Sequence, residues 1–422
     1  MKSIPVAGVD VSRKFSDMCI LSPENDVFAR LKIYHDLTSM ERASEALHDA
    51  EKKLGGKPVI VMESTSHYHL LLFQFFKYAG YDVIVVNPIQ SGALRNINVR
   101  KIKTDKADAY KIAMLYRMKV LRASQIPVDA LRGLRALCRQ HHELKCDITR
   151  YKNRLTALLD QVFPGYEKIF ANVGTRASLA VLEVYPTPQI LLLANPNELS
   201  ELIWKTSRKS IAYGKNKAEL LRNTAETALK LGIHAPADSA LITSVVSILK
   251  LLLESVAQID REIDALARQD AYLRETLSLL QTIPGIGPFS AAVILSEIGD
   301  FSLFQKPKQL AAYFGLDPSE RQSGTFYGTK NKISKRGSHY VRSVLHMAAH
   351  NAVHPNRFGQ FNNPVLAAFY QEKCKVKPSK VAICAVMHKL VNIIFAVLRD
   401  RKPFELRQPK EHAKRIGILI AA

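Results

Sequence analysis

Two closely spaced acids in the first third of the chain have the residue types needed for phosphate chemistry. Asp105 and Asp108 lie three residues apart after Thr104. A threonine there can cap a helix, so both carboxylates fall on one face of its first turn. Neighbouring carboxylates repel each other, and a divalent cation such as Mg²⁺ (or Mn²⁺) relieves that repulsion through oxygen coordination. The helix dipole also favours acids in a first turn, so simple capping is the alternative.

Two further acids belong to the elements expected before this helix. The pattern predicts strands at 6–11, 15–21, 27–33, 58–62 and 83–86, and helices at 37–54 and 67–78. Asp10 lies at the end of the first strand and Glu63 at the end of the fourth. This β-β-β-α-β-α-β order followed by a helix is that of the RNase H-like fold, a mixed sheet covered by helices. The four acids fall where that fold can bring carboxylates to one Mg²⁺ site.

The charge of the chain favours a polyanionic partner. The formal net charge is +22 over 422 residues. Between Phe301 and Ala422 there are 21 Lys and Arg residues against 6 Asp and Glu residues. Such a concentration of cations is typical of nucleic-acid binding. Four more cations precede the Thr104 helix and are candidate phosphate contacts: Arg95, Arg100, Lys101 and Lys103.

Composition also bears on the compartment. We find no stretch with the length and apolarity of a membrane span, and we expect no membrane partner. Residues 1–5 lead directly into a strand pattern and do not resemble a signal peptide. Five cysteines without framework spacing fit a reducing cytoplasm. Cys138, His142 and Cys146 share a helix face, but no second cluster completes a metal site, so we expect none there.

The middle of the chain is predicted to be helical. Apolar residues recur in steps of three and four from Leu134 to Val162 and again from Ile242 to Leu266, which is a heptad pattern. The two helices can pair with each other or build a dimer, and a plain helical core is equally compatible. Between them lies a mostly helical insert, residues 166–240, with the only tryptophan and a basic run for which nucleic-acid contact and a solvated face are equally plausible.

Two glycine-containing loops stand out in the C-terminal part. The sequence from Leu279 to Gly287, before a helix at 288–298, resembles a helix-hairpin-helix. In that motif, backbone amides near Gly285 and Gly287 can hold a DNA phosphate. An ordinary glycine turn is the alternative. The second loop contains Ser323 before Gly324. That serine can be a turn residue or a nucleophile on a loop of cations, and composition does not choose between the two. The neighbouring cations and candidate nucleic-acid contacts are Arg321, Lys332, Lys335 and Arg336.

These motifs, in this order, resemble transposases of the insertion-sequence one-ten family, including its one-one-one-one group. The motifs that carry the resemblance are Gly8-Val9-Asp10, Glu63-Ser64-Thr65, Asn87-Pro88, 103–109, 283–287, 314–318, Ser323-Gly324 and 333–337 followed by Arg342. The resemblance covers nearly the whole chain and is weakest in the insert, which shorter members lack.

The resemblance implies both an architecture and an activity. The fold class is α/β plus α: a RuvC-like DEDD domain (1–122), coiled-coil helices with the insert (123–270), a mostly helical transposase domain (271–400) and a basic tail (401–422). It implies that Asp10, Glu63, Asp105 and Asp108 bind Mg²⁺, and that Ser323 attacks a DNA phosphodiester to form a 5′-phosphoserine link. Implied partners are element and target DNA, a structured bridge RNA that selects sequences by pairing, and further copies of the chain in a dimer or tetramer. The expected location is the bacterial or archaeal cytoplasm, at the nucleoid.

Two other functions use the same residues. A metal-dependent junction nuclease would use the four acids with water as nucleophile. A non-catalytic nucleic-acid-binding protein would use the acids only to cap and structure the fold. The residues also leave open whether Ser323 or a neighbour such as Ser319 attacks.

Overall fold

A computed structural model gives the arrangement of the chain in two compact units, Met1–Ile126 and Pro127–Ala422. The residues described are 4–63, 68–86, 105–118, 123–124, 129–232, 238–319, 322–323, 326–327 and 332–408. The four domain ranges expected from the sequence remain predictions.

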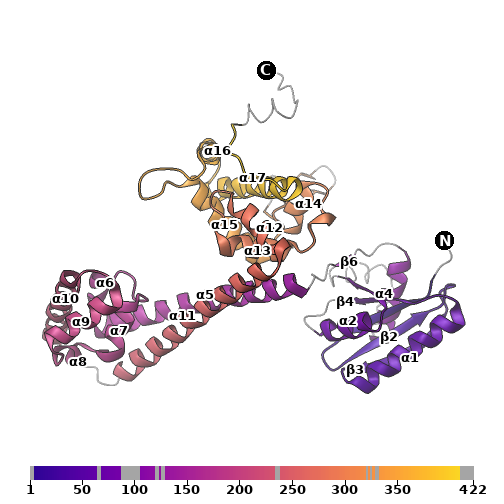
Figure 1. Ribbon diagram of the computed structural model, residues 1–422, viewed down its shortest axis with the longest axis horizontal. Helices are drawn as coiled ribbons and strands as arrows, with labels where there is room; N and C mark the ends of the chain where they lie inside the picture. Colours follow the sequence, from indigo (N-terminus) through magenta and orange to yellow (C-terminus); the bar gives the residue numbers. More distant parts are fainter. Residues whose placement is uncertain are drawn as a thin grey trace. The chain divides into compact units, whose positions relative to one another are not determined.

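The N-terminal unit is a mixed sheet between helices. Its strands lie in the order β3-β2-β1-β4-β5-β6, in which β1 pairs antiparallel with β2 and parallel with β4. Helices α1 and α2 cover one face and α4 covers the other (Figure 1). The bounds are β1 Val6–Val11, β2 Phe15–Leu21, β3 Val27–Tyr34, α1 Leu37–Leu54, β4 Val59–Glu63, α2 His69–Tyr78, β5 Asp82–Val86, α4 Asp105–Arg117 and β6 Ala123–Ser124. The five strands and three helices expected from the sequence are confirmed, and their order is consistent with an RNase H-like fold.

Strand β6 was not predicted. It has two residues and pairs antiparallel with the end of β5, through Val85 opposite Ser124 and Val86 opposite Ala123. Two residues are too few to show an alternating pattern, so the sequence carries no signal for this strand.

Two long helices run through the second unit. They are α5 Asp129–Val162 and α11 Asp238–Gln269. Leu134 near the start of α5 shares a core with Ile263 near the end of α11, whereas Leu155 shares another core with Ile242 near the start of α11. The helices are therefore antiparallel neighbours within one chain. Their heptad pattern is satisfied by this pairing, and a supercoiled coiled coil stays a prediction.

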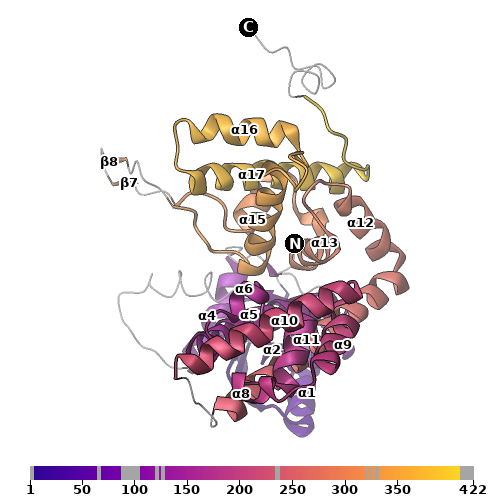
Figure 2. The ribbon, with the colours of Figure 1, turned by 90° about the vertical axis from the view of Figure 1, so that its left-hand side faces the viewer.

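Five helices gather at the end of this pair where α5 ends and α11 begins (Figures 1 and 2). Capping side chains fix several of their starts, such as Thr175 for α7 and Ser210 for α10. They form the insert expected from the sequence as mostly helical. Their bounds are α6 Tyr166–Ile169, α7 Arg176–Val184, α8 Pro188–Leu192, α9 Pro196–Ser207 and α10 Ile211–Lys230.

A second helical core surrounds the opposite end of the pair. Its centre is α17, whose buried residues contact α12, α14, α15 and α16. A hairpin of two strands, each of two residues, follows α14 and was not predicted from the sequence. The bounds are α12 Ala271–Gln281, α13 Pro288–Ile298, η1 Phe301–Leu303, α14 Pro307–Tyr313, β7 Gln322–Ser323, β8 Phe326–Tyr327, α15 His339–Val353, α16 Pro364–Cys374 and α17 Ser379–Asp400.

Helices α11 and α17 correct one expectation. By length and composition alone, both are long and apolar enough to cross a membrane, so the statement that no stretch reaches that apolarity was wrong. Both helices contribute buried residues to the helical cores. A helix that is apolar around most of its surface can belong to a protein core as well as to a membrane, and the apolar stretch is 56% buried in α17 and 28% buried in α11.

Candidate active site

Asp10 and Glu63 lie at the same level of two adjacent parallel strands. The register of β1 and β4 pairs Val9 with Met62, and each acid is the next residue of its strand. Side chains alternate along a strand, so Asp10 shares a face with Val6, and Glu63 shares that face with Val61. Glu63 is only 6% exposed and Asp10 is half-buried. The two carboxylates thus come from neighbouring strands and face the side of the sheet covered by α4.

Helix α4 packs unusually close to the sheet, at Gly8. A Cβ atom on Gly8 would lie 2.1 Å from the carbonyl oxygen of Ala109 and 2.7 Å from the backbone nitrogen of Ala113. Only a residue without a side chain permits that contact. The helix therefore crosses β1 two residues before Asp10.

The direction of α4 follows from its last residue. The Arg117 guanidinium donates to the carbonyls of Ile4 (2.8 Å), Ser22 (2.6 Å) and Pro23 (2.8 Å). Ile4 precedes β1 and Ser22 follows β2, so the end of α4 lies where β1 begins. The start of α4 must lie at the opposite edge, where β1 and β4 end. Burial lowers the pKa of Arg117, and nearby Glu24 raises it.

Asp105 and Asp108 open α4 at that edge. Asp108 is 5% exposed, and Lys111 donates to its carboxylate at 3.0 Å. Asp105 is the first residue of α4. Its side chain lies outside the described residues, as do Thr104 and the expected phosphate contacts Arg95, Arg100, Lys101 and Lys103.

A buried acid that the sequence analysis missed lies beside Asp10. Asp17 of β2 pairs with Asp10 in the antiparallel register, and its side chain is buried. Side chains two residues apart in a strand share a face, so Asp17 lies on the same face as Cys19 and Leu21, which pack against α4. An acid in the middle of the predicted strand 15–21 was the available signal.

The identity and placement of these acids fit a site for a hard divalent cation. Asp10, Asp17, Glu63 and Asp108 are carboxylates of β1, β2, β4 and α4, and these positions lie at one edge of a single sheet. Among the described side chains, no three His, Cys, Asp or Glu residues are close enough to hold a metal ion. The side chain of Asp105 is not among them. The elements therefore bring the described acids to one edge of the sheet.

The loop that carries Ser323 begins and ends at a hydrogen-bonded neck in the second unit. The backbone nitrogen of Ser319 donates to the carbonyl of Lys332 at 2.7 Å, and that of Ser334 donates to the carbonyl of Asp317 at 2.7 Å. Ser323 lies in β7, opposite Phe326 of β8. Its side chain and Arg321 lie outside the described residues.

The two other serines at this neck use their hydroxyls for structure. Ser319 Oγ donates to the carbonyl of Lys332 at 2.9 Å, and Ser334 Oγ donates to the carboxylate of Asp317. These bonds hold the two sides of the neck together.

Exposed cations flank the neck. Lys332, Lys335 and Arg336 are all exposed to solvent. The backbone around Gly337 packs closely against the backbone around Gly315. A Cβ atom would meet backbone atoms at 2.6 Å on Gly315 and at 2.0 Å on Gly337. These contacts fix the backbone that carries Lys335 and Arg336.

The turn from Thr282 to Gly287 joins α12 to α13. Gly285 has φ +95°, and a Cβ there would lie 2.6 Å from the carbonyl oxygen of Ala348 in α15. Gly287 is the N-cap of α13, and a Cβ there would meet open space. Packing therefore requires a glycine at 285, whereas the role of both glycines in phosphate binding stays a prediction.

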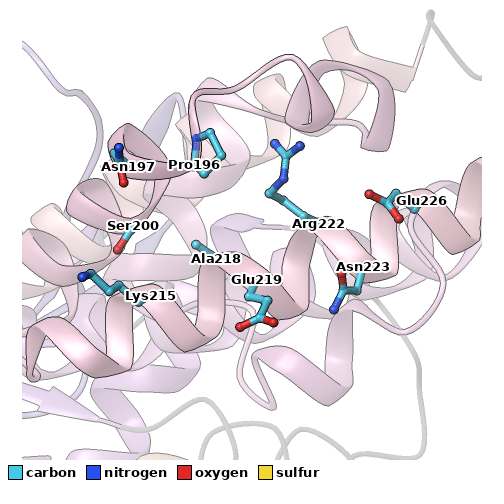
Figure 3. A pocket seen from close by; sticks show the side chains of 9 residues that line it. All are labelled: Pro196, Asn197, Ser200, Lys215, Ala218, Glu219, Arg222, Asn223 and Glu226. Atoms are coloured by element: carbon cyan, nitrogen blue, oxygen red, sulfur yellow. The ribbon is translucent and has the colours of Figure 1, made fainter.

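The insert contains a pocket of about 380 Å³ between α9 and α10, and Figure 3 shows its lining side chains. The Arg222 guanidinium already donates to the carbonyls of Leu192 (3.4 Å) and Ala194 (3.1 Å). The lining contains charges of both signs, so it does not favour an anion. It consists of Pro196, Asn197, Ser200, Lys215, Ala218, Glu219, Arg222, Asn223 and Glu226.

Comparison with known proteins finds two matching domain families. Residues 7–164 match a family described as "Transposase", whose model is named for the DEDD transposases of IS110, and residues 277–371 match "Transposase IS116/IS110/IS902 family". The first match contains all four acids and the second contains Ser323.

Several individual proteins are also similar. The "Pilin gene-inverting protein" of Moraxella bovis is 37% identical over 155 residues, which are 36% of this chain and 46% of that protein. The match therefore spans less than half of that relative. The "Insertion element IS116 uncharacterized 44.8 kDa protein" of Streptomyces clavuligerus is 25% identical over 403 residues, 95% of this chain and 96% of that protein. The "Transposase for insertion sequence element IS1111A" of Coxiella burnetii is 32% identical over 97 residues, 22% and 24% of the two chains.

Proposed function

Because this chain belongs to the IS116/IS110/IS902 family of transposases, we propose that it cuts and rejoins DNA strands to move a DNA segment. The observation that carries the proposal is the placement of α4. Gly8 and Arg117 fix the helix on the sheet so that its first turn lies at the edge where Asp10 and Glu63 end their strands.

In the proposed reaction the acids of the N-terminal unit hold the catalytic cation. Asp10, Glu63, Asp105 and Asp108 supply its oxygen ligands. When bound, Mg²⁺ or Mn²⁺ polarises the phosphate and stabilises the charge that develops on its oxygens. Burial of Glu63 and Asp108 keeps the carboxylates away from bulk water, which strengthens their attraction to a cation.

The hydroxyl of Ser323 is the proposed nucleophile. Its oxygen loses its proton and forms a bond to the DNA phosphorus, while the bond from phosphorus to the 3′-oxygen of the neighbouring nucleotide breaks. That 3′-oxygen takes up one proton and leaves as a hydroxyl, which balances the proton lost by the serine. Attack by a free 3′-hydroxyl on the phosphoserine then restores the serine. Ser319 is the weaker candidate because its hydroxyl already donates to Lys332.

The DNA and RNA contacts belong to the same proposal. Lys332, Lys335 and Arg336 bind phosphates, and the α12–α13 turn acts as a helix-hairpin-helix at a further phosphate. A bridge RNA supplies sequence choice by pairing, and oligomer formation brings serine and acids together. The names of the relatives include gene inversion as well as transposition, and strand exchange can produce either outcome.

Adduct trapping tests the chemistry. Full-length protein, candidate element RNA, Mg²⁺ and labelled junction DNA are mixed, denatured and separated by electrophoresis. We expect a slow, protease-sensitive DNA band that disappears with Ser323→Ala and with Asp10→Asn. Ser319→Ala is the matched control and should retain the band.

Other outcomes separate the alternative functions. Metal-dependent cleavage without an adduct, unaffected by Ser323→Ala, would identify a nuclease that uses water. Omitting the RNA tests guidance: an unchanged yield of adduct at one sequence would contradict a requirement for RNA.

A further inference from the structure

The loop between α15 and α16 projects from the helices of the second unit (Figure 1). Pro355 and Phe361 form an isolated β-bridge across its base. The side chain of Asn356 accepts hydrogen bonds from the backbone nitrogens of Phe358 (2.9 Å) and Gln360 (3.1 Å). Gly359 closes the turn with φ +77°. The tip of the loop therefore has a defined conformation before any partner binds.

Further hydrogen bonds anchor this loop to the helices. Asn362 donates through Nδ2 to the carbonyl of Asn351 at 2.8 Å. Asn363 is 1% exposed, and its side chain accepts from the backbone nitrogen of Leu366 at 3.0 Å. A loop fixed at both its tip and its base loses little conformational entropy when it binds.

The tip presents an aromatic ring and a cation to solvent. Phe358 is 70% exposed, although phenylalanine is normally buried. The guanidinium carbon of Arg357 lies 4.6 Å from the centre of its ring. The pair thus offers a flat apolar surface with a positive charge beside it, and it contributes no buried residue to the core.

The surroundings of the loop favour an anionic partner. No Asp or Glu occurs in the sequence between Glu320 and Glu372, a stretch that includes the Ser323 loop, α15 and this loop. Three histidines lead along α15 to the loop, with ring centres 4.5 Å apart for His346 and His350 and 5.0 Å apart for His350 and His354. The 15 residues of α15 span about 22 Å. This acid-free stretch of sequence runs from the proposed nucleophile loop through α15 to Phe358. Near the start of α15, at the end away from Phe358, Tyr340 donates to Glu143 of α5 at 2.9 Å.

We propose that the 354–363 loop is a base-stacking element, in which Phe358 packs against an unpaired nucleobase and Arg357 contacts the adjoining phosphate. Aromatic rings stack on any base, so the contact is independent of sequence. Strand exchange creates unpaired bases, and a rigid ring can hold one apart from its former partner. The inference rests on the proposed function for its substrate, but it can be measured without catalysis.

The experiment uses full-length protein in EDTA with two probes. One is a duplex DNA with a short single-stranded gap that contains 2-aminopurine, and the other is an intact duplex of the same length. Phe358→Ala should weaken binding to the gapped DNA about tenfold and remove the fluorescence change of 2-aminopurine, with little effect on the intact duplex. Phe358→Trp should retain both signals, and Arg357→Ala should weaken binding to both probes.

Tyr272→Ala is the matched control. Its ring lies 5.3 Å from the guanidinium of Arg401, so it forms a similar pair, but Arg401 is held by Glu275 at 2.8 Å. Binding should not change. Circular dichroism melting checks that each variant is folded.

The outcomes distinguish this inference from the proposed function. The binding series is repeated with a gapped RNA duplex of the same design. If Phe358→Ala binds gapped DNA and gapped RNA as well as wild type does, the loop does not stack on bases; a protein-binding loop would give this result. Phe358 dependence with RNA alone would support stacking and assign the base to RNA. Phe358-dependent binding in EDTA, combined with no Ser323 adduct in the separate assay with Mg²⁺, would count against the serine nucleophile but leave the stacking element intact.

Discussion

His141 is a buried titratable residue at the contact between the helix pair and α13. It is 7% exposed, its ring lies 3.9 Å from that of Phe289, and its Nε2 lies 3.3 Å from a carboxylate oxygen of Asp260. Burial lowers its pKa most, while Asp260 raises it and Lys145 lowers it further. The neutral imidazole is therefore the form favoured by the fold.

This lowered pKa predicts a pH-dependent stability. In the unfolded chain His141 takes up a proton near pH 6.5, whereas in the folded chain it does so only at lower pH. Its contribution to stability is therefore present above that pH and is lost as the pH falls from about 6.5 toward the folded pKa. Urea unfolding followed by circular dichroism should show a shallower decline in this range for His141→Gln. The exposed His48→Gln is the control, and equal slopes for both variants would contradict the assignment.

Sequence patterns identified candidate acids more readily than the structural surroundings of those acids. Asp10 and Glu63 were selected because each lies at the end of an apolar strand, which is a local pattern. Asp17 was overlooked because its significance comes from the register with Asp10, which is a contact between strands. Phe358 was overlooked because exposure cannot be read from a residue type that is usually buried. The role of Ser323 stays a prediction, since its side chain is not described.

At the scale of elements, α4 and β1 form the contact that positions the acids. Gly8 occurs in the sequence as part of the Gly8-Val9-Asp10 motif, but only the packing explains it. The backbone of α4 occupies the space that a side chain would fill. The positions of strands and helices along the chain could be predicted from alternation and periodicity. The short distance between α4 and β1 at Gly8 could not be predicted in this way.

Gly8→Ala should therefore separate α4 from the sheet. The added methyl group meets backbone atoms at 2.1 Å and 2.7 Å, and no rotamer change can relieve these contacts. We therefore expect the free energy of unfolding to fall by about 1–3 kcal/mol or more. Hydrogen exchange of the β1 and α4 amides should rise, and adduct formation should fall because Asp105 and Asp108 move away. Gly56→Ala is the control, since its nearest neighbour would be Pro5 Cδ at 3.4 Å. Equal protection in both variants would show that α4 is not held at this point.

The helix pair illustrates a different limit of sequence reasoning. The heptad pattern predicted two helices with complementary apolar faces. The same apolar face can pack against a helix of the same chain or of another chain, so the pattern did not identify the partner. The structure satisfies the pattern within one chain, as shown by the cores at its two ends. Which partner is chosen depends on the length and folding of the intervening residues, which a repeat of seven does not encode.

At the scale of the whole molecule, charge determines how the protein meets nucleic acid. The excess of cations lies in the last third of the chain, and Lys335 and Arg336 are exposed beside the Ser323 loop. Each phosphate contact releases counterions, so affinity should fall steeply with salt.

Alanine substitution of Lys335 or Arg336 should weaken binding similarly at all DNA sequences. The slope of log K against log salt should decrease in magnitude by about one for each residue. Fluorescence anisotropy across a series of salt concentrations measures this slope. Lys205→Ala is the control, since Lys205 is paired with Glu201 at 2.7 Å. A slope that is unchanged for all three variants would place the phosphate contacts elsewhere.

The antiparallel arrangement of α5 and α11 has a consequence for how such a gene can change. Val162 at the end of α5 and Ile242 near the start of α11 belong to one core, so the chain enters and leaves the insert at the same place. A deletion or replacement between codons 163 and 237 that keeps the reading frame returns the polypeptide to the same pair of helices. The acids and Ser323 are encoded outside this interval. Evolution can thus exchange the tip of the helix pair without altering the residues proposed to act on DNA.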